Sequence, residues 1–260
     1  MRVLVFPVGL ALAACLGVSP VEPAPLGEGL RVLFIGNSHT YVNDVPGILQ
    51  ALADSAGEEK LAVQSLAPAN YALIDHWNDG VAARIIAGGQ WRFVVLQQGW
   101  TPAGVCQDTL RLATRRFSAG IKAINAVPAL YQVWPPSNRL GQFPGTIESY
   151  RMAAEDVGGL LFPVAEAWQE VLRRDATASL YVDGLHANAA GSYLAALVMY
   201  TRLFNKSPVG LPASVRTRSS VQVLIPATLA ALLQQVAADV GLEATPLTTP
   251  TAQPVITSTC

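Results

Sequence analysis

Hydrophobic and polar residues follow two alternating patterns along most of the 260-residue chain. Short, continuous apolar runs, typical of buried strands, occupy residues 31–35, 61–66, 93–97, 129–134 and 159–163. Apolar residues at three- and four-residue spacing predict helices over residues 45–56, 73–87, 108–126, 146–157, 187–204 and 226–240. Buried strands that alternate with helices indicate an α/β fold, in which helices cover both faces of a five-stranded parallel sheet.

A small polar segment, Gly36-Asn37-Ser38-His39-Thr40, follows directly on the first apolar run. We call residues 36–40 the serine turn. Gly, Asn and Ser are common where a strand turns into a loop, so backbone geometry alone can explain this segment. Parallel sheets also bind their ligands beyond the carboxyl ends of their strands, which is where this segment lies. Ser38 is therefore a candidate nucleophile.

A serine hydroxyl attacks well only when a general base takes its proton and a third group fixes the tautomer of that base. Among the chain's three histidines, His186 has a carboxylate, Asp183, three residues before it in the segment "YVDGLHANAAG". His39 neighbours Ser38, and adjacent side chains usually diverge, whereas His76 lies in a predicted helix. Asp-x-x-His pairs also cap helices, but this one supplies the best candidate base.

Composition and missing motifs narrow the function further. The chain carries 17 Lys and Arg against 18 Asp and Glu, a formal net charge of −1, without the basic excess that nucleic-acid binding needs. It contains no phosphate-binding G-x-x-x-x-G-K-[ST] loop, no H-E-x-x-H zinc motif and no G-x-S-x-G elbow. Nucleotide, zinc-protease and standard α/β-hydrolase chemistries are therefore disfavoured.

Four segments together resemble the SGNH/GDSL hydrolases. Gly36-Asn37-Ser38 is similar to their first block, usually Gly-Asp-Ser, and "DGLHANAAG" is similar to their last block, the Asp-x-x-His. "FVVLQQGW" and "LYQVWPP" resemble the third and fourth strand blocks, so the resemblance covers most of residues 31–205. Two further segments, "GNSHTYVNDVP" and "LFNKSPVGL", resemble a bacterial secreted branch of that superfamily. It implies a flavodoxin-like three-layer α/β/α sandwich, a Ser38–His186–Asp183 catalytic triad, and neither metal nor cofactor.

The sequence departs from the family pattern at the oxyanion hole. The family's second block offers a glycine N–H, and here Asn70 in "SLAPANYAL" is the best match, beside the N–H of Ser38 itself. The third block usually contains an asparagine donor that this chain lacks. Gln97 or Gln98, which end the third apolar run, either supply that amide or contact solvent at the strand end. One missing donor typically costs about a hundredfold to a thousandfold in turnover.

The amino terminus has the layout of a bacterial export signal. One arginine precedes a short apolar segment, and Leu12-Ala13-Ala14-Cys15 resembles the lipobox in which the cysteine is lipidated. The sequence thus predicts a cell-envelope lipoprotein anchored to the membrane through Cys15, at the outer membrane or the periplasmic face. Ordinary signal cleavage and a plain anchor are the alternatives. The predicted organisation is a signal peptide over 1–14, a tether over 15–29, the hydrolase-like domain over 30–243 and a tail over 244–260.

Export leaves Cys106 and Cys260 as an even pair in an oxidising compartment. A disulfide between them would hold the last residue of the chain. The alternative is two unrelated thiols, because sequence does not supply the geometry of a bond.

These features predict a serine esterase that hydrolyses short acyl esters, including O-acetyl groups, on small molecules or glycans. Two alternatives remain: a catalytically silent, surface-anchored binding module on the same fold, and a lipase or thioesterase of the same superfamily. Trp77, Trp100 and Trp134 are either platforms for a sugar ring or members of the core.

Overall fold

The computed structural model describes residues 29–243, and the predicted signal peptide and tail lie outside them. Its central feature is a parallel sheet with the strand order β2-β1-β3-β4-β5. The predicted sheet is therefore confirmed. Its strands are β1 (Leu30–Ile35), β2 (Leu61–Leu66), β3 (Phe93–Leu96), β4 (Val127–Tyr131) and β5 (Leu160–Phe162).

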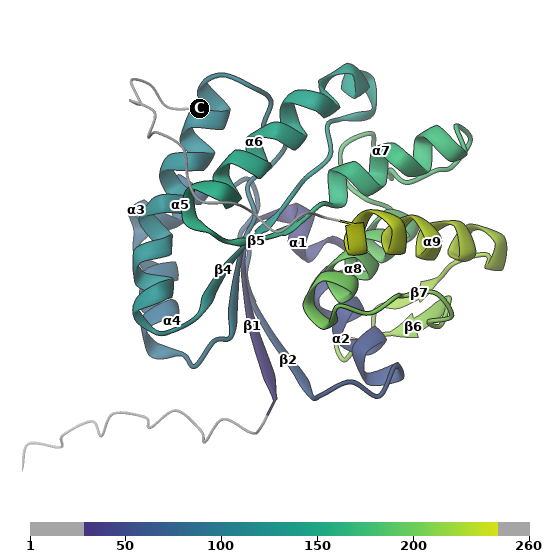
Figure 1. The fold of residues 1–260 in the computed structure, drawn as a ribbon, viewed down its shortest axis with the longest axis horizontal. Helices are drawn as coiled ribbons and strands as arrows, with labels where there is room; N and C mark the ends of the chain where they lie inside the picture. The colour runs from purple at the N-terminus through teal and green to yellow at the C-terminus, as the bar shows by residue number, and fades with distance from the viewer. Residues whose placement is uncertain (1–28, 244–260) are drawn as a thin grey trace, which may run out of the picture.

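Helices cover both faces of the sheet and make it a three-layer sandwich (Figure 1). One layer holds α3 (Leu73–Asp79), α4 (Val81–Gly88), α5 (Val105–Ala123) and α6 (Phe143–Val157). The other holds α2 (Val45–Ser55), α8 (Ala189–Phe204) and α9 (Ala227–Glu243), with α7 (Val164–Arg174) packed against α8 and α9. Successive side chains of a strand point to opposite faces, so a doubly covered sheet needs continuous apolar runs, as β1 has.

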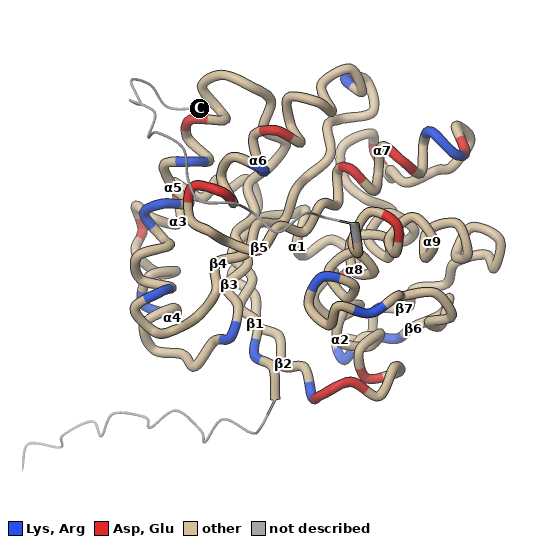
Figure 2. Tube along the Cα trace, viewed as in Figure 1, with Lys and Arg blue, Asp and Glu red and all other residues tan. Residues whose placement is uncertain are grey.

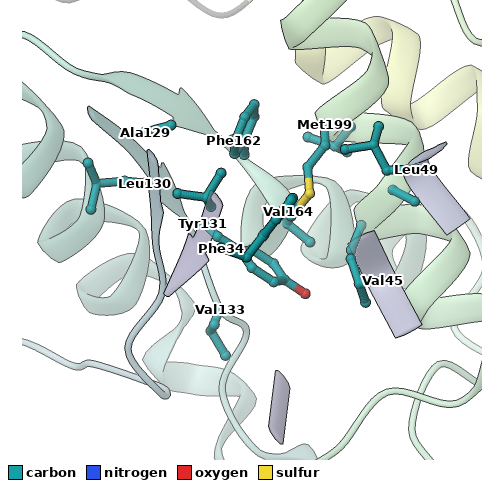
Figure 3. Packing of buried hydrophobic residues seen from close by; sticks show 14 of the residues in the cluster. Phe34, Val45, Leu49, Ala129, Leu130, Tyr131, Val133, Phe162, Val164 and Met199 are labelled. Carbon is teal, nitrogen blue, oxygen red and sulfur yellow. The ribbon is translucent and has the colours of Figure 1, made fainter. Parts of the chain in front are cut away.

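The core between the sheet and the α2–α8 layer is closely packed (Figure 3). Phe34 of β1 and Phe162 of β5 face Met199 of α8 and Leu49 of α2, and all four are almost completely excluded from solvent. Each such side chain contributes about 1.5–3 kcal/mol through removal of apolar surface from water. This packing fixes the helices against the strands and so fixes the loops at the sheet's carboxyl edge.

Several helical details differ from the sequence prediction. The helix expected over 73–87 is two helices, because Gly80 adopts a left-handed conformation (φ 69°) that ends α3 and precedes α4. Helix α7 follows β5 almost directly and was not predicted, although Trp168 and Val171 give it a buried face. Further unpredicted elements are the short helix α1 (Ser38–Tyr41), the 3-10 turns η1 (Val42–Asp44) and η2 (Ser137–Gln142), and an antiparallel hairpin of β6 (Ser214–Arg216) and β7 (Gln222–Leu224).

Basic and acidic residues are interspersed along the helices (Figure 2). Within residues 29–243, none of the helices combines the length and the apolar character that a membrane crossing requires.

Candidate active site

The serine turn changes the chain's direction at the carboxyl end of β1. Gly36 lies so close to Gln97, one residue past β3, that a Cβ there would be 2.3 Å from Gln97 Oε1, so a larger residue would have to displace that side chain. Asn37 caps α1, and its Oδ1 accepts a hydrogen bond from the His39 N–H at 3.1 Å. Ser38 is therefore the first residue of a helix, where the backbone N–H has no partner within the helix.

The second part of the site is the loop between α7 and α8. Asp183 Oδ1 accepts hydrogen bonds from the backbone N–H groups of Leu185 (2.9 Å) and His186 (2.7 Å). Gly184 takes the left-handed conformation (φ 85°) that this tight turn requires. The Val182 N–H donates to the His186 carbonyl at 3.0 Å and closes the loop.

The fold brings this loop against the serine turn, although 148 positions separate their key residues. Ser38 Oγ lies 2.9 Å from His186 Nε2, and His186 Nδ1 lies 2.7 Å from Asp183 Oδ2. The Asp183 carboxylate can only accept, so Nδ1 carries the proton and the Nε2 lone pair faces the serine hydroxyl. Hydrogen bonds from the His186 ring, then from the backbone of His186 and Leu185, hold the pKa of Asp183 far below its ordinary value. The carboxylate therefore stays ionised and orients the imidazole.

A solved structure resembles this chain in both fold and sequence. A protein from Slackia heliotrinireducens that is assigned to the SGNH hydrolases is 28% identical, with a TM-score of 0.57, over 68% of this chain and 100% of that protein. Together with the matching blocks around Ser38 and His186, this similarity identifies the superfamily. The chain belongs to the SGNH/GDSL hydrolase superfamily.

Two more distant structures share the hydrolase's fold. LAE5, an α/β hydrolase enzyme from the metagenome of Lake Arreo in Spain, is 18% identical, with a TM-score of 0.54 over 67% of this chain and 96% of its own. A GDSL-like lipase from Parabacteroides merdae is 13% identical, with a TM-score of 0.52 over 68% of this chain and 96% of its own. No family model and no curated protein matches the sequence.

The backbone candidates for the hydrolase's oxyanion hole lie in two linked loops. None of the hydrogen bonds among residues 29–243 uses the Ser38 N–H. Asn70 is exposed and left-handed (φ 62°), a conformation that asparagine tolerates better than most residues and that is compatible with its predicted match to the family's glycine. Asn37 Nδ2 donates to the neighbouring Tyr71 carbonyl at 2.8 Å and ties this loop to the serine turn.

Gln97 does not have the side-chain role that its position at the strand end predicts. Its Nε2 donates to Asn37 Oδ1 at 2.9 Å and to the Gln98 carbonyl at 2.7 Å. A carboxamide has two N–H hydrogens, and both are engaged, so none is available for an oxyanion. The prediction of Gln97 as an oxyanion donor is wrong. Gln98 is buried beside it and makes only a long contact, 3.4 Å from its Nε2 to Thr101 Oγ1, so it stays a candidate.

The two other histidines line and support the site. His39 is buried edge-on against Trp134, with its ring centroid 5.5 Å from that of His186. Burial first, then the neighbouring His186, lowers the pKa of His39 to about 3, so this ring stays neutral. The fully buried His76 of α3 donates from Nε2 to the Gly36 carbonyl at 2.8 Å, which holds the backbone at the start of the serine turn.

The tryptophans divide between core and surface. Trp134 is completely buried and stacks on Trp168 with ring centroids 3.8 Å apart, so of its two alternatives it belongs to the core. Trp77 is exposed on α3 and packs edge-on against Phe117. Trp100 follows β3 and is half-buried under the guanidinium of Arg139, 5.4 Å from its ring centroid.

The described residues contain no arrangement suited to a metal ion, and one cysteine among them is disulfide-bonded. Within residues 29–243, no group of three or more His, Cys, Asp and Glu side chains is arranged to hold a metal ion. Cys106, near the start of α5, is disulfide-bonded. The other two cysteines, Cys15 and Cys260, lie outside the described residues, so the lipidation of Cys15 and the pairing of Cys106 with Cys260 stay predictions.

Proposed function

We propose that this hydrolase is a serine esterase in which Ser38, His186 and Asp183 form the catalytic triad. The observation that carries the proposal is the aligned pair of short contacts, 2.9 Å from Ser38 Oγ to His186 Nε2 and 2.7 Å from His186 Nδ1 to Asp183 Oδ2. Both distances lie within the range in which a proton can be transferred or an imidazole held in one tautomer.

In the acylation step, Ser38 Oγ forms a bond to the ester carbonyl carbon while His186 Nε2 takes the hydroxyl proton. The tetrahedral intermediate collapses, the bond from carbon to the alcohol oxygen breaks, and His186 returns the proton to the leaving alcohol. Water then attacks the acyl-serine with His186 again as base, which releases the carboxylic acid and restores the serine hydroxyl. Asp183 stabilises the imidazolium that forms in each step.

The backbone N–H groups of Ser38 and Asn70 stabilise the oxyanion in this proposal. The free Ser38 N–H at the start of α1 and the left-handed backbone of Asn70 support it. Gln98 is the remaining side-chain candidate for a third donor, because its amide has only one long contact among the described residues. Two strong donors with a weak third predict a slower enzyme than one with three.

We extend the proposal to short acyl esters, including O-acetyl groups, carried by small molecules or glycans. The accessibility of the triad supports this substrate class: the Asp183 side chain is 52% exposed and that of His186 is 25% exposed. A triad at the surface accepts an ester on a bulky alcohol, because the alcohol stays in solvent while only the acyl group approaches the serine turn.

Location forms part of the same proposal. A lipid on Cys15 would anchor the enzyme to a bacterial membrane and hold it close to envelope esters. Detergent-phase partitioning of the full chain, expressed with its signal, tests this anchor. We expect the wild type in the detergent phase and the Cys15→Ser variant in the aqueous phase, and a wild type found wholly in the aqueous phase contradicts the anchor.

A catalytically silent binding module remains the second candidate. The observation that favours it is that both N–H hydrogens of the Gln97 amide are already donated within the protein, so Gln97 has none to donate to an oxyanion. A fluorophosphonate probe on purified protein separates the two. We expect covalent labelling of wild type and none of Ser38→Ala. Hydrolysis of 4-nitrophenyl esters of two to twelve carbons then distinguishes an esterase, fastest on acetate, from a lipase, fastest on long chains. Absence of both labelling and hydrolysis favours the binding module.

A further inference from the structure

Side chains from three other elements hold the backbone of the serine turn. His76 of α3 donates to the Gly36 carbonyl at 2.8 Å, and Tyr131 of β4 donates from its hydroxyl to the His39 carbonyl at 3.2 Å. Gln97, one residue past β3, makes the remaining and most extensive contact, with Asn37. All three side chains are buried, so water does not compete for these hydrogen bonds.

Gln97 satisfies every hydrogen-bonding group of its carboxamide within this turn. Its Oε1 accepts from the Asn37 N–H and from Thr40 Oγ1, both at 2.8 Å. Its Nε2 donates to Asn37 Oδ1 and to the Gln98 carbonyl. The Asn37 N–H can only donate, so the amide has a single orientation, with its oxygen toward that N–H. Gln97 thus contacts the residue before Ser38 and, through Thr40, the helix turn after it.

The same contact determines how Asn37 is oriented. Because Gln97 donates to Asn37 Oδ1, the Asn37 amide must direct its Nδ2 away, toward the Tyr71 carbonyl that accepts from it at 2.8 Å. Tyr71 follows Asn70, the second candidate oxyanion donor. A single buried carboxamide therefore connects the Ser38 backbone with the loop of Asn70.

We propose that Gln97 is a positioning residue. It holds Ser38 Oγ in hydrogen-bonding position to His186, and it holds the backbone N–H groups of Ser38 and Asn70 in fixed positions relative to each other. This inference rests on the proposed esterase function. A strand end buried for packing alone would be filled by an apolar side chain at lower desolvation cost. The carboxamide instead spends both donors and its acceptor on and around the serine turn, where an error of 1 Å lowers turnover by about a hundredfold.

Gln97→Met tests the role, because methionine keeps the length of the side chain and removes its hydrogen bonds. Gln132→Met is the matched control: Gln132 is also a fully buried glutamine just past a strand, but it bonds Glu166 and Ile147 away from the triad. With 4-nitrophenyl acetate we expect Gln97→Met to lower kcat by about 10- to 100-fold while KM changes less than about threefold. We expect Gln132→Met to change kcat less than about threefold at a similar loss of melting temperature.

The rate of fluorophosphonate labelling provides a second readout, since it reports the reactivity of Ser38 without turnover. It should fall in Gln97→Met and not in Gln132→Met. If Gln97→Met does not fold, Thr40→Val removes one bond to Gln97 Oε1 and should lower kcat by about three- to tenfold. Its control, Thr146→Val, removes a buried hydroxyl with no hydrogen-bond partner among the described residues and should leave kcat unchanged.

Equal kcat values for the Gln97 and Gln132 variants, or a loss confined to KM, would overturn the positioning role. Equal kcat values for Thr40→Val and Thr146→Val would also overturn the positioning role. Ser38→Ala in the same assay distinguishes a failure of the proposed esterase mechanism from a failure of the proposed role of Gln97. If Ser38→Ala remains active, the esterase mechanism itself fails. If Ser38→Ala is inactive while the paired variants behave alike, only the role of Gln97 fails.

Discussion

At the scale of single residues, Asp183 has two separate functions. Its Oδ1 accepts two backbone N–H groups and shapes the loop, while its Oδ2 holds the His186 ring. Of these two residues, Ser38 contacts only the His186 ring. The proposed catalysis therefore depends on Asp183 Oδ2, and the conformation of the loop depends on Asp183 Oδ1. Substitutions at the three positions of the proposed triad should therefore differ in their effects.

We expect Ser38→Ala and His186→Ala each to lower the kcat of ester hydrolysis by several orders of magnitude, and their combination to lose little more. The loss of kcat in Asp183→Asn should be about ten- to a hundredfold smaller than in either of these variants, because the amide oxygen still accepts hydrogen bonds from the loop. Some kcat is still lost, because the NH₂ group favours the wrong tautomer of His186. Steady-state kinetics with thermal melts as folding controls measure these effects. Losses that multiply in the double variant contradict a triad that acts as a unit.

His39 predicts how stability depends on pH. Its pKa is lowered by burial from the ordinary 6.5 to about 3 in the folded protein. Between these values the unfolded chain binds a proton that the folded protein does not, so stability falls as pH decreases from about 6.5 toward 3. Between pH 7 and pH 4.5 this one group should cost on the order of 2–3 kcal/mol.

Urea unfolding at pH 7 and pH 4.5 tests this prediction with wild type and His39→Phe, which keeps a ring against Trp134 and cannot titrate. We expect the variant to lose less stability on acidification than the wild type. Equal losses in the two proteins would show that His39 is not kept neutral by the fold.

At the scale of elements, apolar periodicity predicts what packing against a sheet requires. All five strands lie within two or three residues of their predicted ends, because a doubly covered sheet demands continuous apolar runs. Helix α7 was missed because it follows β5 without a polar linker, and the break at Gly80 depends on a backbone conformation that periodicity does not report.

The candidate site also contains residues that the sequence predicts and one whose role it does not predict. Ser38, Asp183 and His186 could be selected from the sequence because a nucleophile, base and acid have recognisable chemistry. The role of Gln97 could not, because it depends on β3 lying beside β1, and strand order is not encoded in local pattern. A polar side chain at the end of a buried run was the only available signal, and it fits a donor and a support equally well.

The junction between β1 and β3 leads to a prediction about Gly36. A Cβ there would lie 2.3 Å from Gln97 Oε1 and 2.5 Å from Thr40 Oγ1, so Gly36→Ala must displace the polar contacts that hold the serine turn. We expect a loss of about 1–3 kcal/mol in the free energy of unfolding and a lower kcat. Gly120→Ala is the control: it lies in α5 with open space around it and should stabilise by about 0.5–1 kcal/mol. A Gly36→Ala protein as stable and active as wild type contradicts the close approach.

At the scale of the whole molecule, the site joins distant parts of the chain. Ser38 follows the first strand, whereas Asp183 and His186 precede α8, which packs against α2. The α2–α8 contact therefore holds the two halves of the proposed triad in register, and Met199 of α8 and Leu49 of α2 both belong to the buried core of this layer (Figure 3). The fold places the site where the carboxyl edge of the sheet meets this helix layer.

We expect a disulfide bond to hold the end of the chain. Cys106 is disulfide-bonded, and a lipid on Cys15 would leave Cys260 as its partner. In the chain-entropy model, closing so long a loop stabilises by about 4–5 kcal/mol at most, and less where little structure depends on the tail. Peptide mapping of the exported protein without reduction should recover the Cys106 and Cys260 peptides as one linked species, and Cys260→Ser should leave one alkylatable thiol at Cys106. Two free thiols in the wild type, or a Cys106 peptide linked to Cys15, would show that the chain end is not held in this way.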